Sequence, residues 1–200
     1  MKQIGYAKRK KIDLEELVDK FELAMKFQPQ KNGEISRFKK IIDFLLANIK
    51  NNRSKKGIVF LCIGTDRSTG DCLGPLLGYK IQHLESKNVK VFGTLDEPVH
   101  ANNLEFYRRI ISRDYPDWFV IAIDAAIGDE KDVGTVNIHI GSIQPGAGLG
   151  KKLGTIGDIS ITGVVAPEHL ANCLNATRLS KVMKMVDFIC EGISVINLSY

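Results

Sequence analysis

The sequence predicts a three-layer α/β/α sandwich with a mostly parallel sheet, preceded by N-terminal helices. Short apolar runs that are rich in β-branched and aromatic residues indicate strands covered on both faces. Helical patterns lie between these runs, and strands that alternate with helices are typical of a largely parallel sheet. The chain has 200 residues, which is long enough to bury a substantial core without disulfides or structural metals.

The N-terminal part of the chain has a helical pattern. Asp13 can cap a helix over residues 14–27, in which apolar side chains recur at helical spacing. After a polar break, a second apolar face runs through residues 35–49. The polar residues 50–56 that follow end the helical part of the chain. The change of pattern therefore divides the chain into an N-terminal basic helical segment, residues 1–56, and an α/β domain, residues 57–200.

The second part of the chain contains five runs that predict strands and three amphipathic stretches that predict helices. The expected strands are residues 57–64, 89–95, 117–125, 135–141 and 158–166. The expected helices are residues 73–84, 101–112 and 168–191. A long loop rich in glycine joins the last two strands, and loops of this length in compact domains are commonly functional.

The basic excess of the chain is confined to its N-terminal part. Residues 1–56 hold 15 Lys and Arg against 7 Asp and Glu, whereas the remainder holds 13 against 16. The short basic cluster at residues 8–11 could contact nucleic acid or an acidic partner, or could simply be solvated. Basic residues are not interleaved with aromatic ones, so nucleic-acid binding is not expected to be the function.

The location expected for the protein is the cytoplasm. No apolar stretch is long enough for a transmembrane helix, and the Lys-rich N-terminus has no apolar region of the kind that a secretory signal carries. The four cysteines show no C-x-x-C pair and no zinc-ligand spacing. Three of them lie in apolar contexts, where a reduced buried thiol fits a reducing compartment.

Acidic residues follow three successive predicted strands. Ligands bind outside the carboxyl ends of the strands in open α/β sheets, so these residues are candidates for a site. The first strand is followed by Asp66 and Asp71 and the second by Asp96, Glu97 and His100, whereas the third has Asp124 at its end. If the three strands are neighbours, their acids converge on one edge of the sheet.

Asp71 and Asp124 are the two strongest candidates. Asp124 lies between apolar residues, and a carboxylate placed there loses solvation, which raises its pKa unless a partner compensates. The structural alternative is that Asp124 bonds backbone N–H groups of its own turn. Asp71 precedes a predicted helix with Gly74 and Pro75 in its first turn, so helix capping and catalysis are both open for it.

Two carboxyl groups in one site support two kinds of chemistry. They can share a proton and activate water, or they can hold a metal that activates it. A metal site needs a third ligand, and His169, at the start of the last predicted helix, is the residue that suits this role. His100 is a further candidate by type, and it could instead pair with Cys72 as a nucleophile. The Gly-rich stretch before Pro75 matches neither a phosphate-binding loop nor a dinucleotide fingerprint.

Several motifs in the same order resemble the YyaC-type sporulation proteins, which are relatives of the spore germination protease. The motifs are IGTDRSTGDCLGPLLG, TLDEPVHANNL, IDAAIG, PGAGLGKKLGTIGDISITG and NATRLSKVMKM, and the match covers residues 57–190. The resemblance implies an α/β/α sandwich of the phosphorylase/hydrolase-like type. It also extends, more distantly, to the hydrogenase-maturation endopeptidases.

The resemblance implies roles for the two aspartates. The germination protease is regarded as an atypical aspartic peptidase with one acid in a D-x-L-G-P stretch, matched by Asp71, and one in an I-D-A stretch, matched by Asp124. The hydrogenase-maturation enzymes use acids at the same two places, with a histidine, to bind the metal of their substrate. His169 falls near that third place.

The expected function is therefore a sporulation-associated peptidase of a spore-forming bacterium, acting in the cytoplasm or the forespore. Asp71 and Asp124 are expected to be catalytic, with Asp66, Asp96, Glu97 and His100 supporting them or binding substrate. No cofactor is required, and the partner is a peptide or protein, with a homo-oligomer left open. The alternatives are a peptidase that binds a divalent metal through Asp71, Asp124 and His169, and a non-catalytic binding protein on the same fold.

Overall fold

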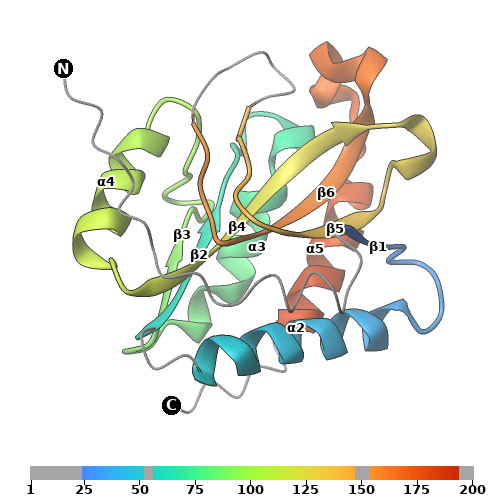
Figure 1. The fold of residues 1–200 in the computed structure, drawn as a ribbon. Coiled ribbons are helices and arrows are strands. Elements are labelled where there is room, and N and C mark those ends of the chain that lie inside the picture. Colours follow the sequence, from blue (N-terminus) through green and yellow to red (C-terminus); the bar gives the residue numbers. More distant parts are fainter. Residues whose placement is uncertain (1–23, 52–55, 147–153, 194–200) are drawn as a thin grey trace.

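A computed structural model of the chain describes residues 24–51, 56–146 and 154–193. Its centre is a six-stranded sheet with the order β1-β5-β6-β4-β2-β3 (Figure 1). The strands are β1 (Ala24–Phe27), β2 (Gly57–Cys62), β3 (Val89–Phe92), β4 (Trp118–Gly128), β5 (Val136–Ile140) and β6 (Ile159–Pro167). All strands point the same way except β5, which is antiparallel to β1 and to β6. The predicted α/β fold with a mostly parallel sheet is therefore confirmed.

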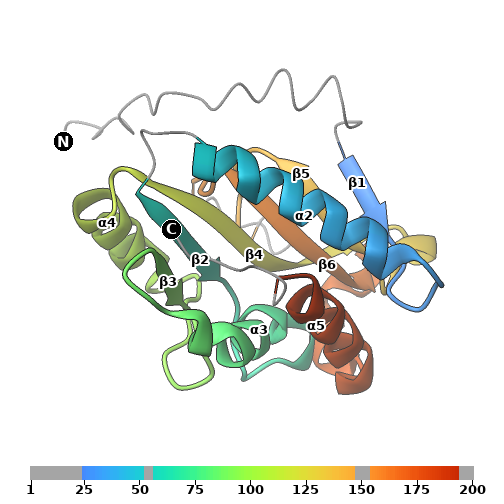
Figure 2. The ribbon, with the colours of Figure 1, turned by 90° about the horizontal axis from the view of Figure 1, so that it is seen from below.

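Helices cover both faces of the sheet, as Figure 2 shows from below. One face carries α2 (Glu34–Asn51), α3 (Leu73–Ile81) and α5 (Leu179–Ile193), and the other carries α4 (Leu104–Asp114). The side chains of β2 point alternately to the two faces of the sheet, and both sets are apolar. Phe60 belongs to the core under α2, α3 and α5, whereas its neighbours Val59 and Leu61 belong to the smaller core under α4.

The N-terminal part differs from its prediction at β1. Residues 24–27 were expected to end a helix, but they form a strand that pairs antiparallel with β5, from Ala24 opposite His139 to Phe27 opposite Val136. That expectation is wrong because a partner strand distant in sequence decides the conformation, and local spacing does not report it. Residues 14–23 of the expected helix lie outside the described residues. The second expected helix is confirmed as α2.

The boundary that the pattern suggests at residue 57 is not a boundary of the core. Phe27 of β1 and Phe38 of α2 are fully buried, and both pack against Phe188 of α5. The ring centroids of Phe27 and Phe38 are 5.0 Å apart in an edge-to-face arrangement, which is a favourable geometry for aromatic pairs. The two parts of the chain therefore share one hydrophobic cluster.

The last predicted helix is divided in two. A 3-10 helix, η5 (Glu168–Ala176), comes directly after β6, and α5 begins only at Leu179. Thr177, which ends η5, has φ −64° and ψ 129°, an extended conformation that interrupts helical hydrogen bonding. Among the residues that the structure describes, no helix combines the length and the apolar character needed to cross a bilayer.

Candidate functional site

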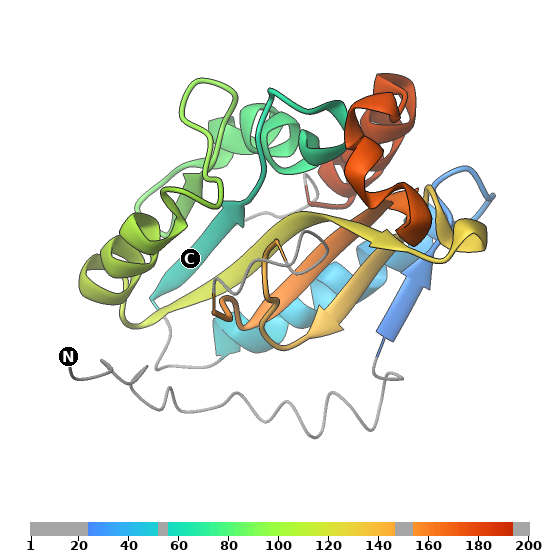
Figure 3. The same cartoon turned by 90° about the horizontal axis from the view of Figure 1, so that it is seen from above.

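A pocket of about 880 Å³ lies at the carboxyl end of the central strands. Figure 3 shows this end of the sheet from above. The lining comes from the segments that follow β2 and β3, from the last part of β4, and from the segment after β5. β6 and η5 contribute Thr162, Val165 and Leu174. The strand ends that carry the predicted acids are neighbours in the order β4-β2-β3, so the expected convergence on one edge occurs.

The segment after β2 is held in a tight turn that begins at Gly64. Its φ of +142° lies in a region that side chains rarely adopt, and a Cβ atom there would lie 2.0 Å from the backbone oxygen of Asp71. The N–H of Thr65 donates to that same oxygen at 3.0 Å. The turn therefore brings Asp71 back to the end of β2.

Helix α3, which begins two residues after Asp71, holds the chain on the C-terminal side of this residue. A Cβ atom on Gly74 would lie 2.0 Å from the backbone oxygen of Ile63, so the helix packs directly on the backbone at the end of β2. Asp71 itself belongs to a 3-10 turn, η1 (Thr69–Asp71), and Cys72 is the N-cap residue of α3. Asp71 therefore precedes the cap position that was one of its two expected roles.

Asp124 lies inside β4, whereas the sequence placed it at the end of a strand. Its neighbour Ile123 is the last residue of β4 that pairs with β2, opposite Cys62. β4 then continues to Gly128 beside β6, with Asp124 opposite Thr162. The prediction missed this extension because β6, which supports it, follows later in the chain. Asp124 is thus the first residue of β4 beyond its pairing with β2.

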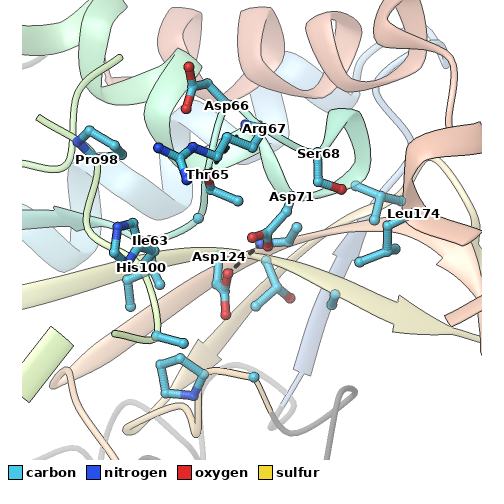
Figure 4. A pocket seen from close by; sticks show the side chains of 18 of the residues that line it. Ile63, Thr65, Asp66, Arg67, Ser68, Asp71, Pro98, His100, Asp124 and Leu174 are labelled. Atoms are coloured by element: carbon cyan, nitrogen blue, oxygen red, sulfur yellow. Dashed lines mark hydrogen bonds between the residues drawn. The ribbon is translucent and has the colours of Figure 1, made fainter. Parts of the chain in front are cut away.

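The carboxyl group of Asp124 is buried and lies beside that of Asp71. Asp124 is 9% exposed, and its Oδ1 accepts a hydrogen bond of 2.9 Å from the N–H of Ala125 (Figure 4). Burial raises the pKa of Asp124 well above its usual value, and the negative charge of Asp71 raises it further. The bond from Ala125 opposes this increase without cancelling it. The backbone bond expected of a structural aspartate is thus present, but the pKa of the carboxyl group stays raised.

Asp124→Asn is expected to stabilise the protein more at pH 8 than at pH 5. A raised pKa means that the folded state binds the proton more tightly than the unfolded state, so the stability from this group is lost as pH rises through the folded pKa. Asparagine stays neutral and keeps an oxygen for the N–H of Ala125. Each pKa unit corresponds to about 1.4 kcal/mol, which urea unfolding at the two pH values can measure. An equal effect at both pH values would contradict the raised pKa.

Three of the four supporting residues line the pocket. Asp66, Asp96 and His100 are in its lining, whereas Glu97 is not. Glu97 instead lies near Tyr107 of α4. Burial raises the pKa of Tyr107, and the negative charge of Glu97 raises it further. The expected place of Glu97 at the site is therefore not found.

The loop that carries His100 is held by hydrogen bonds. The backbone N–H of His100 donates to Oδ1 of Asn103 at 2.8 Å, and Nδ2 of Asn103 donates to the oxygen of Pro98 at 2.9 Å. The Nδ1 atom of His100 accepts a bond of 3.3 Å from the N–H of Asn102. The proton of a neutral His100 ring must then lie on Nε2, which leaves that nitrogen as a donor.

The residues needed for a metal site or a cysteine nucleophile are not brought together. His169 is exposed in η5 and does not line the pocket, and no group of three or more His, Cys, Asp or Glu side chains among the described residues could hold a metal ion. Burial raises the pKa of Cys72, and the charges of Asp66 and Asp71 raise it further. The reactive thiolate of Cys72 is therefore disfavoured, which argues against the Cys72–His100 pair.

The family of the chain follows from its sequence match. Residues 30–192 match the family described as "Protein of unknown function (DUF1256)". The chain belongs to the DUF1256 family. It is also 41% identical over 158 residues to "Uncharacterized protein YyaC" of Bacillus subtilis (strain 168), a match that covers 78% of this chain and 77% of that protein. The expected resemblance to YyaC-type proteins is thereby confirmed.

The DUF1256 match includes every pocket-lining residue in the part of the chain that the structure describes, and some of these were missed by sequence reasoning. Arg67, Ser68 and Asn102 lie inside the motifs that were singled out, so their place in a strand-end loop was a usable signal. Thr162 also lies inside one of these motifs, but in a predicted strand and not in a loop, and Leu174 lies outside all of them. Their position depends on the β4–β6 register and on the packing of η5 against η1, which only the folded chain shows.

Proposed function

We propose that this DUF1256 chain hydrolyses peptide bonds with a pair of aspartates, Asp71 and Asp124. The observation that carries the proposal is that the buried carboxyl group of Asp124 shares one pocket with Asp71, and burial and the charge of Asp71 raise the pKa of Asp124. Two carboxyl groups of one pocket, of which one has a raised pKa and so binds its proton more tightly than an ordinary aspartate does, form an acid and base pair. Such a pair can activate water without a cofactor.

The proposed reaction uses each carboxyl group in turn. Ionised Asp71 accepts a proton from the attacking water while the oxygen bonds to the peptide carbonyl carbon, and Asp124 donates its proton to the carbonyl oxygen. The resulting tetrahedral diol then collapses. The C–N bond breaks, Asp71 gives its proton to the leaving nitrogen, and Asp124 regains its own from the diol. The aspartates end the cycle as they began it.

The local sequences around the two aspartates support the same proposal. Asp71 is the first residue of a D-x-L-G-P stretch, and Asp124 is the middle residue of an I-D-A stretch. The germination protease that the chain resembles has its two acids in the same kinds of stretch. We extend the proposal accordingly to a peptidase of sporulation that acts in the cytoplasm or the forespore. Asp66, Asp96 and His100 line the same pocket and would contact the substrate or orient the water.

The test of the proposed function is a cleavage assay on mixed peptides. The purified chain is incubated with a synthetic library of random decapeptides, and products are identified by mass spectrometry with and without EDTA. We expect new peptide termini that appear in both conditions. Cleavage that EDTA abolishes would contradict the aspartate-pair mechanism, and the absence of cleavage from every peptide would contradict peptidase activity.

The rate of hydrolysis is expected to fall as pH rises through the pKa of Asp124. Only the protonated form of Asp124 can donate to the carbonyl oxygen, and its pKa lies well above the value of an ordinary aspartate. Measurement of kcat/KM from pH 4 to pH 9 should therefore show about a tenfold loss per pH unit on the alkaline side. A rate that increases steadily to pH 9 would rule out this assignment of the acid.

A further inference from the structure

The part of β4 beyond Ile123 has one edge without a neighbouring strand. β2 ends at Cys62, and the N–H of Ile63 donates to the oxygen of Ile123 at 2.7 Å as the last bond between the two segments. Ile63 then forms a bridge with Val99, away from β4. Among the described residues, β4 pairs only with β6 from Asp124 onward.

The backbone groups on this edge point into the space that β2 would have filled. Successive residues of a strand direct their N–H and C=O groups alternately to the two sides. Because the oxygen of Ile123 faces β2, the groups of Ala125 and Ile127 face the same side. The N–H of Ala125 is already bonded to Oδ1 of Asp124. The oxygen of Ala125 and both backbone groups of Ile127 lie on the side of β4 that faces away from β6, although β6 itself shifts register opposite Ala126 and Ile127.

The pocket lies along this edge. Asp124, Ala125, Ala126 and Ile127 all line it, together with Asp71 and Leu174. In Figure 4, Leu174 lies at one end of the view and His100 at the other, with the two aspartates between them. The cavity therefore follows the direction of β4 and passes the carboxyl groups on the way.

We propose that the substrate is an extended peptide segment that adds to this edge of β4 as a further strand. The inference rests on the proposed function and specifies how its substrate is bound. Main-chain bonds to Ala125 and Ile127 align the peptide, as in other cases of strand addition. At 3.3 Å per residue, about four residues of peptide cover the edge from Asp124 to Gly128.

The two ends of the pocket differ in the side chains that they offer to the peptide. Beside Ile127 the lining is apolar, with Val165 and Leu174. On the side of His100 it is polar and charged, with Asp66, Arg67 and His100 (Figure 4). The peptide is thus expected to place apolar side chains on one side of the cleaved bond and polar or charged ones on the other, because the polar end holds carboxylates together with the cation of Arg67.

The experiment measures binding to a chain that does not cleave. A fluorescein-labelled library of random octapeptides is screened on the Asp71→Asn variant, in which Asp124 and its bond to Ala125 remain. The peptide that binds most tightly is then resynthesised with a single N-methyl group at each residue in turn. N-methylation removes one backbone N–H and leaves the side chains unchanged. We expect alternate positions to lose about tenfold or more in affinity, and the positions between them to lose much less.

A second set of variants tests the protein side of the same bonds. Ile127→Pro removes the N–H that faces the free edge, and proline is tolerated at an edge position of a strand. Ile127→Val keeps that N–H and serves as the matched control. We expect about a tenfold loss of peptide affinity for the proline variant and less than a threefold change for valine.

Three results would overturn the inference: no peptide in the library binds, N-methyl groups have the same effect at every position, or Ile127→Pro binds as tightly as Ile127→Val. Failure of the proposed function is a separate outcome. Alternation in binding without any cleavage by the unsubstituted chain would remove the peptidase activity and keep the strand addition. Cleavage by the unsubstituted chain, with N-methyl effects on binding that do not alternate, would keep the peptidase activity and remove the strand addition.

Discussion

Asp71→Asn is expected to reduce peptide hydrolysis by about 10³-fold or more, because the variant has no carboxylate to take the proton from water. Asp124→Asn is expected to cause a loss of the same size, since an amide cannot donate a proton as the carboxyl group of Asp124 does. Both substitutions conserve the shape of the side chain, and both variants should fold. The measurement is kcat/KM on a peptide identified in the cleavage assay, with circular dichroism as the check on folding.

Asp129→Asn is the matched control for these two variants. Asp129 directly follows β4, is exposed, lies outside the pocket lining and forms an ion pair with Lys131 at 3.3 Å. Its replacement should change kcat/KM by less than twofold. Retention of activity in either Asp71→Asn or Asp124→Asn would rule out the aspartate pair as the catalytic group.

Gly74→Ala is expected to destabilise the protein by more than about 2 kcal/mol. The added Cβ would lie 2.0 Å from the backbone oxygen of Ile63 and 2.6 Å from its nitrogen, so helix α3 would have to move away from the end of β2. Backbone atoms at the centre of a sheet cannot move aside as a flexible side chain does. Urea unfolding gives the change in free energy, and the pH profile of the variant reports whether Asp71 has moved relative to Asp124.

Gly128→Ala provides the comparison for Gly74→Ala. The nearest atom to a Cβ at Gly128 is Cγ1 of Val164 at 3.4 Å, which is ordinary van der Waals contact. This variant should differ from the parent by less than about 0.5 kcal/mol. Equal losses of stability in the two variants would show that the close contact between α3 and Ile63 does not carry the effect.

The second part of the chain was predictable because its signals are local. The strand β2 is a continuous apolar run and is buried at every residue, which is the pattern expected of a central parallel strand. Asp124 stood out for a related reason, as a lone carboxyl group in an apolar run. Asp71 was found by its place after a strand and before a helix. These features need only a few neighbouring residues to be recognised.

The features that were missed depend on contacts between distant parts of the chain. β1 is a strand because β5 pairs with it, and its four residues carry too short a pattern to show alternation. The free edge of β4 depends on where β2 stops beside it, at the pairing of Cys62 with Ile123. Glu97 and His169 had suitable chemistry and follow strands of the sheet, but the folded chain places Glu97 near Tyr107 and His169 in the exposed part of η5, outside the pocket lining.

The aromatic cluster under α2 sets the order in which a newly made chain can complete its core. Phe27 and Phe38 leave the ribosome before β5, the partner of β1, which begins roughly 110 residues after β1, and Phe188 follows later still. At typical rates of synthesis this delay is on the order of ten seconds. During that time β1 lacks its partner strand β5, and Phe27 of β1 and Phe38 of α2 lack their contact with Phe188. The native packing of Phe27 and Phe38 therefore has to wait until α5 has been made.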